Sequence, residues 1–381
     1  MSARRELLAS LVGLLSAGCS PTRPVAPPPK PTPATATKPA PTLRGHLFVH
    51  SFGKEALFEC KPACAPLDDP RLGKVGESPR RVAPGRYLLQ AGVFDLATRA
   101  LVPLAPKLDL EQHRYGNLWL LDGAIVSVEF KSTHDVVRVS RAGKPFVPLA
   151  EPIPPKAGDF AFLPDGRHLF KTAPLMGAAE SDHFMDVIAG QKVTLHFVGA
   201  LGDKPRPLVT RDQTLHPDFV RDGASIVYWA PGRLDVQSAF RSLYLERVDV
   251  ADGAVTRLEE LVTPITMRGT PQTLYHGRSR FVVHTTYGPN GKESGVRVVD
   301  AEAKAVMDVP LAADESLARP FNPTHAGNWP WCERRDDDVL ILRRPVDGGV
   351  HVRVLSLPKL ETVLEATVPT PHVTAIDWIR D

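Results

Sequence analysis

The chain has 381 residues, 43% of them apolar, and its 46 basic and 43 acidic residues leave a formal net charge of +3. The charges are spread along the chain, and no basic stripe carries interleaved aromatic residues, which argues against a nucleic-acid partner. The 38 prolines far exceed the roughly 5% that is typical of proteins, and many of them lie close to the N-terminus.

The first segment, residues 1–18, is predicted to be a targeting signal. Two arginines precede the apolar run Leu7–Ser16, which is too short to span a bilayer as a helix. The run leads into Cys19 through Leu-Ser-Ala-Gly, a pattern that resembles the lipobox of bacterial lipoproteins. The resemblance implies that Cys19 becomes a lipidated N-terminus, anchored by several acyl chains. An ordinary cleaved signal with a chance cysteine is the alternative.

Residues 19–42 are predicted to comprise the lipidated cysteine and a disordered, proline-rich tether. Ser20–Thr42 has no aromatic and almost no branched apolar residue, so it has little surface to bury. Its prolines favour polyproline II, in which a segment of this length spans on the order of 70 Å. By resemblance to enterobacterial lipoproteins, Ser20 in place of aspartate favours the outer membrane. We therefore expect a lipid-anchored protein of the bacterial envelope, on the periplasmic face of the outer membrane.

Residues 43–381 are predicted to form one all-β domain, because a hairpin pattern returns along them. In Leu163–Ala173 (LPDGRHLFKTA) a strand end, an Asp-Gly turn and a second strand follow one another. The turn glycines of this pattern recur about 40 to 60 residues apart, a period typical of β-propeller blades. Related stretches are Leu120–Phe130, Val220–Ala230 and, in weaker form, Leu274–His284 and Arg334–Arg344.

Six blades are the preferred prediction and seven the alternative. The repeats place blades at 114–150, 158–210, 216–263, 270–312 and 325–368, with one irregular blade before residue 114. The last segment, 372–381, aligns with the inner strand at Phe219–Asp222. It is therefore predicted to close the ring by pairing with strands from the N-terminal end of the domain.

The repeat also supports a resemblance to a known family. Phe162–Leu169 (FLPDGRHL) and its relative at 219–227 resemble the WD-like repeats of TolB-type periplasmic propellers, which occur also in prolyl oligopeptidase relatives. The resemblance covers about 115–300. The pattern departs at His276, which replaces the aspartate, and at Asp336–Asp338, which replaces Asp-Gly. Because the motif specifies a turn between strands, it implies a fold and not an activity.

The motifs of common catalytic sites are not present. The sequence contains no HExxH, P-loop, GxGxxG or Gly-x-Ser-x-Gly pattern, and the blades leave no residues for a hydrolase domain. We therefore expect no catalytic residue, no cofactor and no metal, and predict that the chain is not an enzyme. The acidic stretches Ser181–Asp186 and Asp336–Asp338 are interpreted as solvated loops rather than cation sites.

Two cysteines are predicted to pair. Cys60 and Cys64 enclose a proline-containing turn, which brings them within reach of a disulfide, and exported proteins retain disulfides. A metal site would need two further ligands at suitable spacing. Cys332 is interpreted as a buried apolar residue, although the sequence does not fix its state.

The aromatic-rich segment Asn322–Trp331 is the predicted binding rim, because tryptophan often carries interface energy. Packing of each tryptophan between blades is the alternative. Scattered histidines near the starts of inner strands are expected to make ordinary hydrogen bonds rather than a channel cluster. The rim residues are His325, Asn328, Trp329 and Trp331.

The sequence therefore favours a membrane-anchored envelope lipoprotein whose propeller is a non-catalytic module that binds a protein or a glycan. The alternative is a small-ligand receptor or enzyme that uses the mouth of the central channel, with convergent His, Asp and Arg side chains there. The first hypothesis instead requires an exposed apolar and aromatic patch on one face. A purely structural envelope component is a third hypothesis. Partner, binding face and oligomeric state are not specified.

Overall fold

The computed structural model describes residues 45–51, 54–60, 64–67, 80–83, 86–89, 92–103, 117–122, 124–130, 135–141, 147–149, 157–172, 192–212, 215–235, 240–264, 274–276, 280–288, 293–318, 338–369 and 375–380. The chain divides into two units, Met1–Pro39 and Ala40–Asp381, and all described residues lie in the second. Every regular element among them is a strand, so the all-β prediction is confirmed. None of the described residues belongs to a helix long and apolar enough to cross a membrane.

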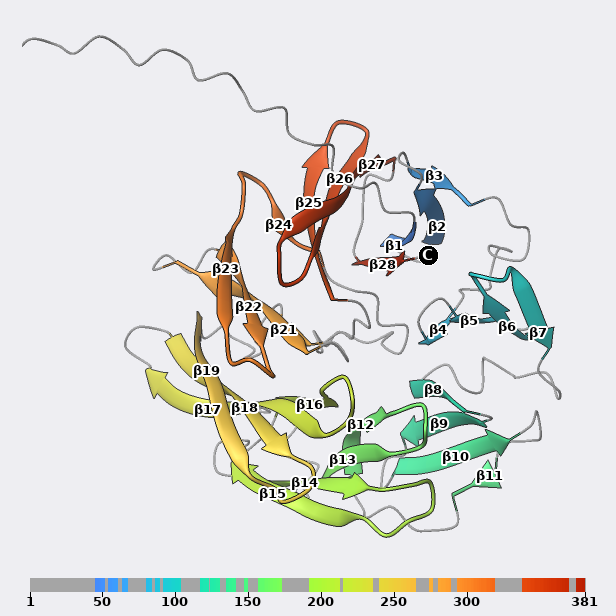
Figure 1. Ribbon diagram of the computed structural model, residues 1–381, viewed down its shortest axis with the longest axis vertical. Coiled ribbons are helices and arrows are strands. Elements are labelled where there is room, and N and C mark those ends of the chain that lie inside the picture. The colour runs from blue at the N-terminus through green and yellow to red at the C-terminus, as the bar shows by residue number, and fades with distance from the viewer. Residues whose placement is uncertain are drawn as a thin grey trace, which may run out of the picture. The chain divides into compact units, whose positions relative to one another are not determined.

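The described strands form seven four-stranded antiparallel sheets, the architecture of a β-propeller (Figure 1). The structure thus has the alternative count of seven sheets and not the preferred six. The sequence prediction treated everything before residue 114 as one irregular blade. Two sheets use this region, because its first three strands take their inner strand from the C-terminal end and the following short strands form a sheet of their own.

Six of the described sheets are meanders whose inner strand comes first in the chain, and the seventh, the closure sheet, takes its inner strand from the C-terminal end. The closure sheet contains β28 (Ala375–Arg380), β1 (Gly45–Ser51), β2 (Lys54–Cys60) and β3 (Cys64–Pro66). The next two sheets contain β4 (Arg80–Ala83), β5 (Arg86–Leu89), β6 (Gly92–Asp95) and β7 (Ala100–Pro103), then β8 (Asn117–Leu121), β9 (Ala124–Phe130), β10 (Asp135–Arg141) and β11 (Val147–Pro148).

The central sheets have longer strands. They contain β12 (Ala157–Phe162), β13 (His168–Thr172), β14 (Lys192–Val198) and β15 (Arg206–Asp212), then β16 (Leu215–Phe219), β17 (Ser225–Asp235), β18 (Phe240–Asp249) and β19 (Val255–Pro264). The last two contain β20 (Leu274–His276), β21 (Phe281–Tyr287), β22 (Glu293–Asp300) and β23 (Val306–Pro310), then β24 (Ser316–Leu317), β25 (Val339–Val346), β26 (Gly349–Ser356) and β27 (Glu361–Val368).

The two ends of the domain meet in the closure sheet. β28 pairs antiparallel with β1 from Gly45↔Arg380 to His50↔Ala375, and β1 pairs with β2 along its whole length. Trp378 is 2% exposed and packs in a core with Leu47, Phe58 and Val352, the last of which comes from the neighbouring sheet. The first and last strands of the domain are therefore held in one sheet by both hydrogen bonds and apolar packing.

Apolar side chains fill the spaces between sheets. Successive residues of the second strands β17 and β21 are all buried, at 226–230 and 281–285, because each lies between two neighbouring sheets. This explains why the strands lack the alternation of a half-exposed sheet. Outer strands such as β15 are largely exposed. Every sheet contacts the next around the ring. Shared apolar clusters join three pairs of sheets, and contacts of β4 with β8, β12 with β16 and β19 with β21 join three more. An ion pair between Arg99 and Glu59 joins the closure sheet to the β4–β7 sheet.

The Asp-Gly pairs lie in the predicted hairpins, but in two of them the connection between the strands is longer than a two-residue turn. These connections are residues 163–167 and 220–224. Gly166 N–H donates to the Leu163 carbonyl, and Gly223 N–H donates to that of Val220, so each Asp-Gly pair forms the last two positions of a four-residue turn. Gly223 has φ +74°, and a Cβ there would lie 2.4 Å from the Leu163 side chain of the preceding sheet. A glycine is thus needed for the backbone conformation and for close approach of the two turns.

Proline recurs on the outer strands, each of which has only one neighbour among the described strands. It is present in six of the seven and follows the seventh directly. The residues are Pro66, Pro103, Pro148, Pro207, Pro264, Pro310 and, after β27, Pro369.

Adjacent glycines in the β25–β26 hairpin give a matched test of this packing. A Cβ on Gly349 would lie 2.2 Å from the Val368 carbonyl oxygen, whereas one on Gly348 would have nothing within 4 Å. We expect Gly349→Ala to lower the free energy of unfolding by about 3 kcal/mol, because the backbone of β27 must move. Gly348→Ala, with φ +76°, should cost only about 1 kcal/mol of backbone strain. Equal midpoints in urea unfolding would contradict this.

Candidate functional site

Most of the predicted site residues lie outside the described part of the chain. This applies to Cys19, to Cys332, to the Ser181–Asp186 stretch and to the whole predicted rim, His325, Asn328, Trp329 and Trp331. Those predictions stay predictions. Among the described residues, no group of three or more His, Cys, Asp or Glu side chains is arranged to hold a metal ion.

The one predicted pair that is described is bonded. The Cys60 and Cys64 sulfurs are 2.00 Å apart, and the two residues lie directly opposite each other in the β2–β3 ladder. Cys60 is fully buried in the core of the closure sheet, and Cys64 is half-buried against it. The disulfide therefore joins the outermost strand of this sheet to its core.

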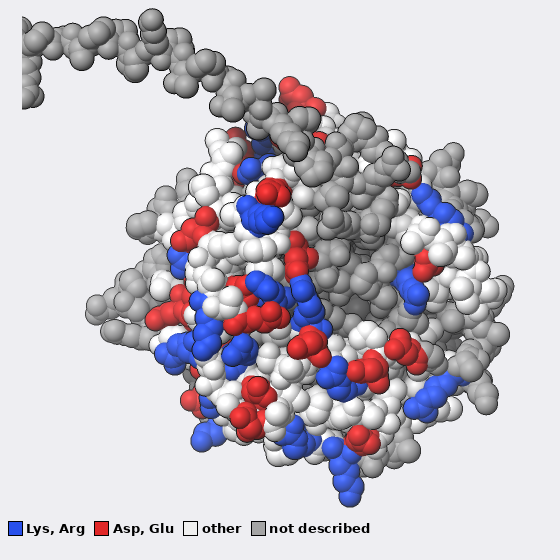
Figure 2. Space-filling model, in the orientation of Figure 1, with Lys and Arg blue, Asp and Glu red and all other residues white. Residues whose placement is uncertain are grey.

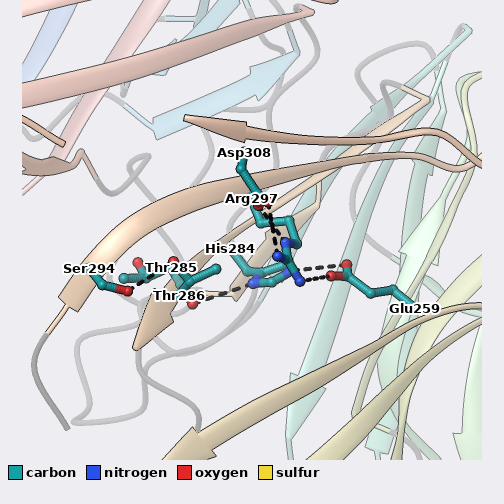
Figure 3. Close-up of polar contacts among 7 residues, drawn as sticks. All are labelled: Glu259, His284, Thr285, Thr286, Ser294, Arg297 and Asp308. Carbon is teal, nitrogen blue, oxygen red and sulfur yellow. Dashed lines mark hydrogen bonds and ion pairs between the residues drawn. The ribbon is translucent and has the colours of Figure 1, made fainter. Parts of the chain in front are cut away.

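A polar network connects two neighbouring sheets, and its residues were not singled out from the sequence (Figure 3). Glu259 on β19 accepts hydrogen bonds from the next sheet through both carboxylate oxygens. His284 Nε2 on β21 lies 3.1 Å from one oxygen, and Arg297 Nη1 on β22 lies 2.9 Å from the other. Arg297 also makes a two-pronged contact with Asp308 on β23, at 2.6 and 3.0 Å. We call these four residues the inter-sheet network.

Burial decides what the inter-sheet network does. The His284 side chain is 0% exposed and that of Glu259 is 7% exposed, while Asp308 is 63% exposed. Hydrogen bonds from the Arg297 guanidinium lower the pKa of Asp308 below its usual range. A His–carboxylate pair performs general acid–base chemistry only within reach of a substrate. With its histidine fully enclosed, this pair instead ties one sheet to the next.

A second buried carboxylate has the same kind of role at the preceding interface. Glu246 on β18 accepts a 2.9 Å hydrogen bond from the Tyr228 hydroxyl and a 3.1 Å hydrogen bond from Arg211 of the preceding sheet. Burial raises the pKa of the Tyr228 hydroxyl most strongly, and the negative charge of Glu246 raises it further. The tyrosine therefore stays a neutral hydrogen-bond donor at physiological pH, and the carboxylate has a permanent partner from each sheet.

The turns between the first and second strands of four sheets form a connected surface, which we call the turn face: Asp122, Pro164–Arg167, Arg221–Gly223 and Asp338. Asp122 N–H donates to the Pro164 carbonyl, and Arg167 Nη2 donates to the Asp222 carbonyl at 3.1 Å. Arg221 pairs with Asp338 from a sheet that is not adjacent to its own in chain order. The turns are therefore held to one another, while Arg221 stays 52% exposed.

His168, at the start of β13 beside the turn face, provides a pH-dependent prediction. Its ring stacks on Phe162 and its Nδ1 lies 3.0 Å from the Gly166 carbonyl. Burial lowers the pKa of His168 below its ordinary value of 6.5. Below pH 6.5 the histidine of the unfolded chain therefore binds a proton more readily than that of the folded chain. The contribution of His168 to the free energy of unfolding is present above pH 6.5 and is lost as the pH falls below it.

We expect His168→Gln to make the stability of the protein less dependent on pH in this range. Urea midpoints of the parent protein should fall between pH 7 and 5 more steeply than those of the variant. Parallel slopes would show that His168 does not contribute to the acid sensitivity.

Comparisons with known proteins agree with a propeller fold. No model of a known protein family matches the chain, and no curated protein matches it in sequence. TolB from Acinetobacter baumannii is 10% identical, with 89% of this chain and 67% of that chain covered, at a TM-score of 0.39. A cobalt-substituted apocarotenoid oxygenase of Synechocystis is 12% identical, with 89% and 93% covered, at 0.45. A prolyl endopeptidase is 13% identical, with 88% and 44% covered, at 0.45.

These similarities concern the fold alone; the class of protein, a β-propeller, follows from the seven four-stranded sheets described above. They also overturn one expectation. The chain was predicted not to be an enzyme, yet several structures of similar fold are apocarotenoid oxygenases. A propeller of this kind is compatible with catalysis, so its fold does not argue against an enzyme. At such low identity the similarity assigns no reaction to this chain.

Proposed function

We propose that this chain is an exported, lipid-anchored envelope protein whose propeller binds a protein or a glycan. The anchor is Cys19, the proline-rich segment 20–42 is the tether, and the location is the periplasmic face of the outer membrane. The observation that carries the proposal is the bonded Cys60–Cys64 pair. Structural disulfides persist in oxidising compartments and are rare in the cytosol, so the bond agrees with the predicted export signal.

The turn face supports binding rather than a purely structural role. Its hairpin turns are attached to one another by the Asp122–Pro164, Arg167–Asp222 and Arg221–Asp338 contacts. A surface that is already ordered loses little conformational entropy when a partner docks. The turn face carries both signs of charge, because it contains Arg167 and Arg221 beside Asp165, Asp222 and Asp338. Positive and negative side chains are likewise interspersed over the described part of the molecule that is visible in Figure 2. Such a mixed surface suits a polar protein or glycan better than a polyanion.

The anchor and the partner can be tested together. Full-length tagged protein is captured from solubilised envelope beside a Cys19→Ala variant, after growth with labelled fatty acid. We expect label on the parent protein alone, and one discrete partner that is retained at moderate salt. An unlabelled parent would refute the anchor, and absence of any partner or glycan from a folded parent would refute the binding role.

The binding surface has its own matched variants. We expect Arg221→Ala to weaken capture of the partner at least tenfold, because this exposed guanidinium belongs to the turn face. Arg344→Ala removes another exposed arginine, on β25 and outside the defined turn face, and should leave capture unchanged. Equal capture by both variants would show that the partner binds to a surface other than the turn face.

A further inference from the structure

The outermost strand of the closure sheet is held by very few backbone contacts. β3 has three residues and, among the described strands, forms ladder contacts only with β2, through Phe58↔Pro66, Glu59↔Ala65 and Cys60↔Cys64. Pro66 has no N–H to donate, and Ala65 and Pro66 are both exposed. Cys64 is the residue of β3 that packs on the core. Besides this short ladder and a contact with β27 of the neighbouring sheet, the disulfide is the side-chain bond that joins β3 to the core.

The remainder of the closure sheet does not depend on that bond. β1 has an extended ladder on both sides, with β28 and with β2. Leu47, Ile376 and Trp378 are all at most 2% exposed and lie in one core. These contacts join the ends of the domain without using β3.

The position of the bond also limits its effect on the whole fold. A disulfide restricts the unfolded chain more strongly when it closes a longer loop. Here the two cysteines are only four positions apart. The bond thus restricts few unfolded conformations, and its effect is concentrated on the strand that it joins.

We propose that the Cys60–Cys64 disulfide is a redox-sensitive clamp that fixes β3 against β2, and that its reduction releases β3 while the ring stays closed. A dithiol reductant supplies two electrons and two protons. The S–S bond breaks, both cysteines become thiols, and the reductant becomes a cyclic disulfide. Release leaves the backbone groups of Phe58–Cys60 at an open sheet edge, which is able to accept an added strand.

Hydrogen exchange of the full chain, with and without dithiothreitol, tests the clamp. On reduction we expect the amides within 58–60 and 64–65 that face the β2–β3 ladder to exchange at least tenfold faster, while the amides of β2 that face β1, and those of β1 and β28, retain their protection. Unchanged exchange at the amides of the β2–β3 ladder would overturn the proposal. Simultaneous loss of protection in β1 and β28 would also overturn it, because the bond would then support the whole closure sheet.

Two cysteine variants separate this bond from other effects of the reductant. Cys64→Ser, which alters only a half-buried side chain, should show the fast pattern without reductant. Cys332→Ser should respond to dithiothreitol as the parent does. A slow pattern in oxidised Cys64→Ser would contradict the clamp. Neither result depends on lipidation or on a partner, so the clamp and the proposed function can fail separately.

Discussion

Deletion of residues 372–381 is expected to abolish recovery of soluble, folded protein. The deletion removes β28, which leaves the backbone of β1 without its inner partner and exposes Leu47 and Phe58 of the core. An unpaired inner edge beside an exposed apolar core favours aggregation. Soluble yield and thermal unfolding of the truncated chain provide the measurement. A truncated chain with the parent's yield and melting temperature would show that β28 is not needed to close the ring.

A point substitution in the same strand separates packing from backbone pairing. Trp378→Ala retains the β28–β1 ladder but removes a side chain that is 2% exposed. We expect it to lower the free energy of unfolding by about 4 kcal/mol, the cost of a large cavity. Trp378→Phe keeps most of the apolar volume and should cost less than half as much. Similar losses for both variants would contradict a packing role.

Loss of the Glu259 carboxylate, at the interface between two other sheets, is also expected to have a large effect. Glu259→Ala leaves His284, which is fully buried, and Arg297 without their shared acceptor. Removal of one partner of a buried ion pair costs about 3 to 5 kcal/mol. We expect the lower end of this range, because Arg297 keeps its two hydrogen bonds to Asp308. Urea unfolding measures the change.

The neighbouring glutamate is the matched control. Glu260 is adjacent on β19 but exposed, and Glu260→Ala should change the free energy of unfolding by less than about 0.5 kcal/mol. A loss at Glu260 equal to that at Glu259 would mean that the strand, rather than the inter-sheet network, is sensitive to substitution.

The fold was predictable because its information is local. The Asp-Gly turns and their spacing specify successive hairpins, and short apolar runs specify strands. The C-terminal strand was recognisable because Trp378 aligns with Phe219, and both residues are buried in the structure. The blade count was not predictable in this way. β4 to β7 have four residues each, too few for their apolar pattern to define a separate sheet.

The inter-sheet network was not predictable, for a geometric reason. In a regular strand, adjacent Glu259 and Glu260 point to opposite faces, but the sequence does not say which one faces the next sheet. An irregularity in the β18–β19 ladder between Leu245 and Glu246 shifts the register at this point. Such a bulge reverses which residues face inward. The repeated hairpin pattern contains no signal for it, whereas the disulfide depended only on a short sequence separation.

The outer prolines bear on how copies of this protein behave when they are crowded together. In the described part of the chain, the large apolar residues that are exposed all lie on outer strands that contain a proline. These residues are Val102, Val147, Val262 and Val306. An apolar edge strand with a free row of donors and acceptors is a template for aggregation. Proline removes a donor from that row and acts as a gatekeeper against continuous pairing between molecules. The ring thus keeps apolar edges in solvent while resisting growth into fibres through them.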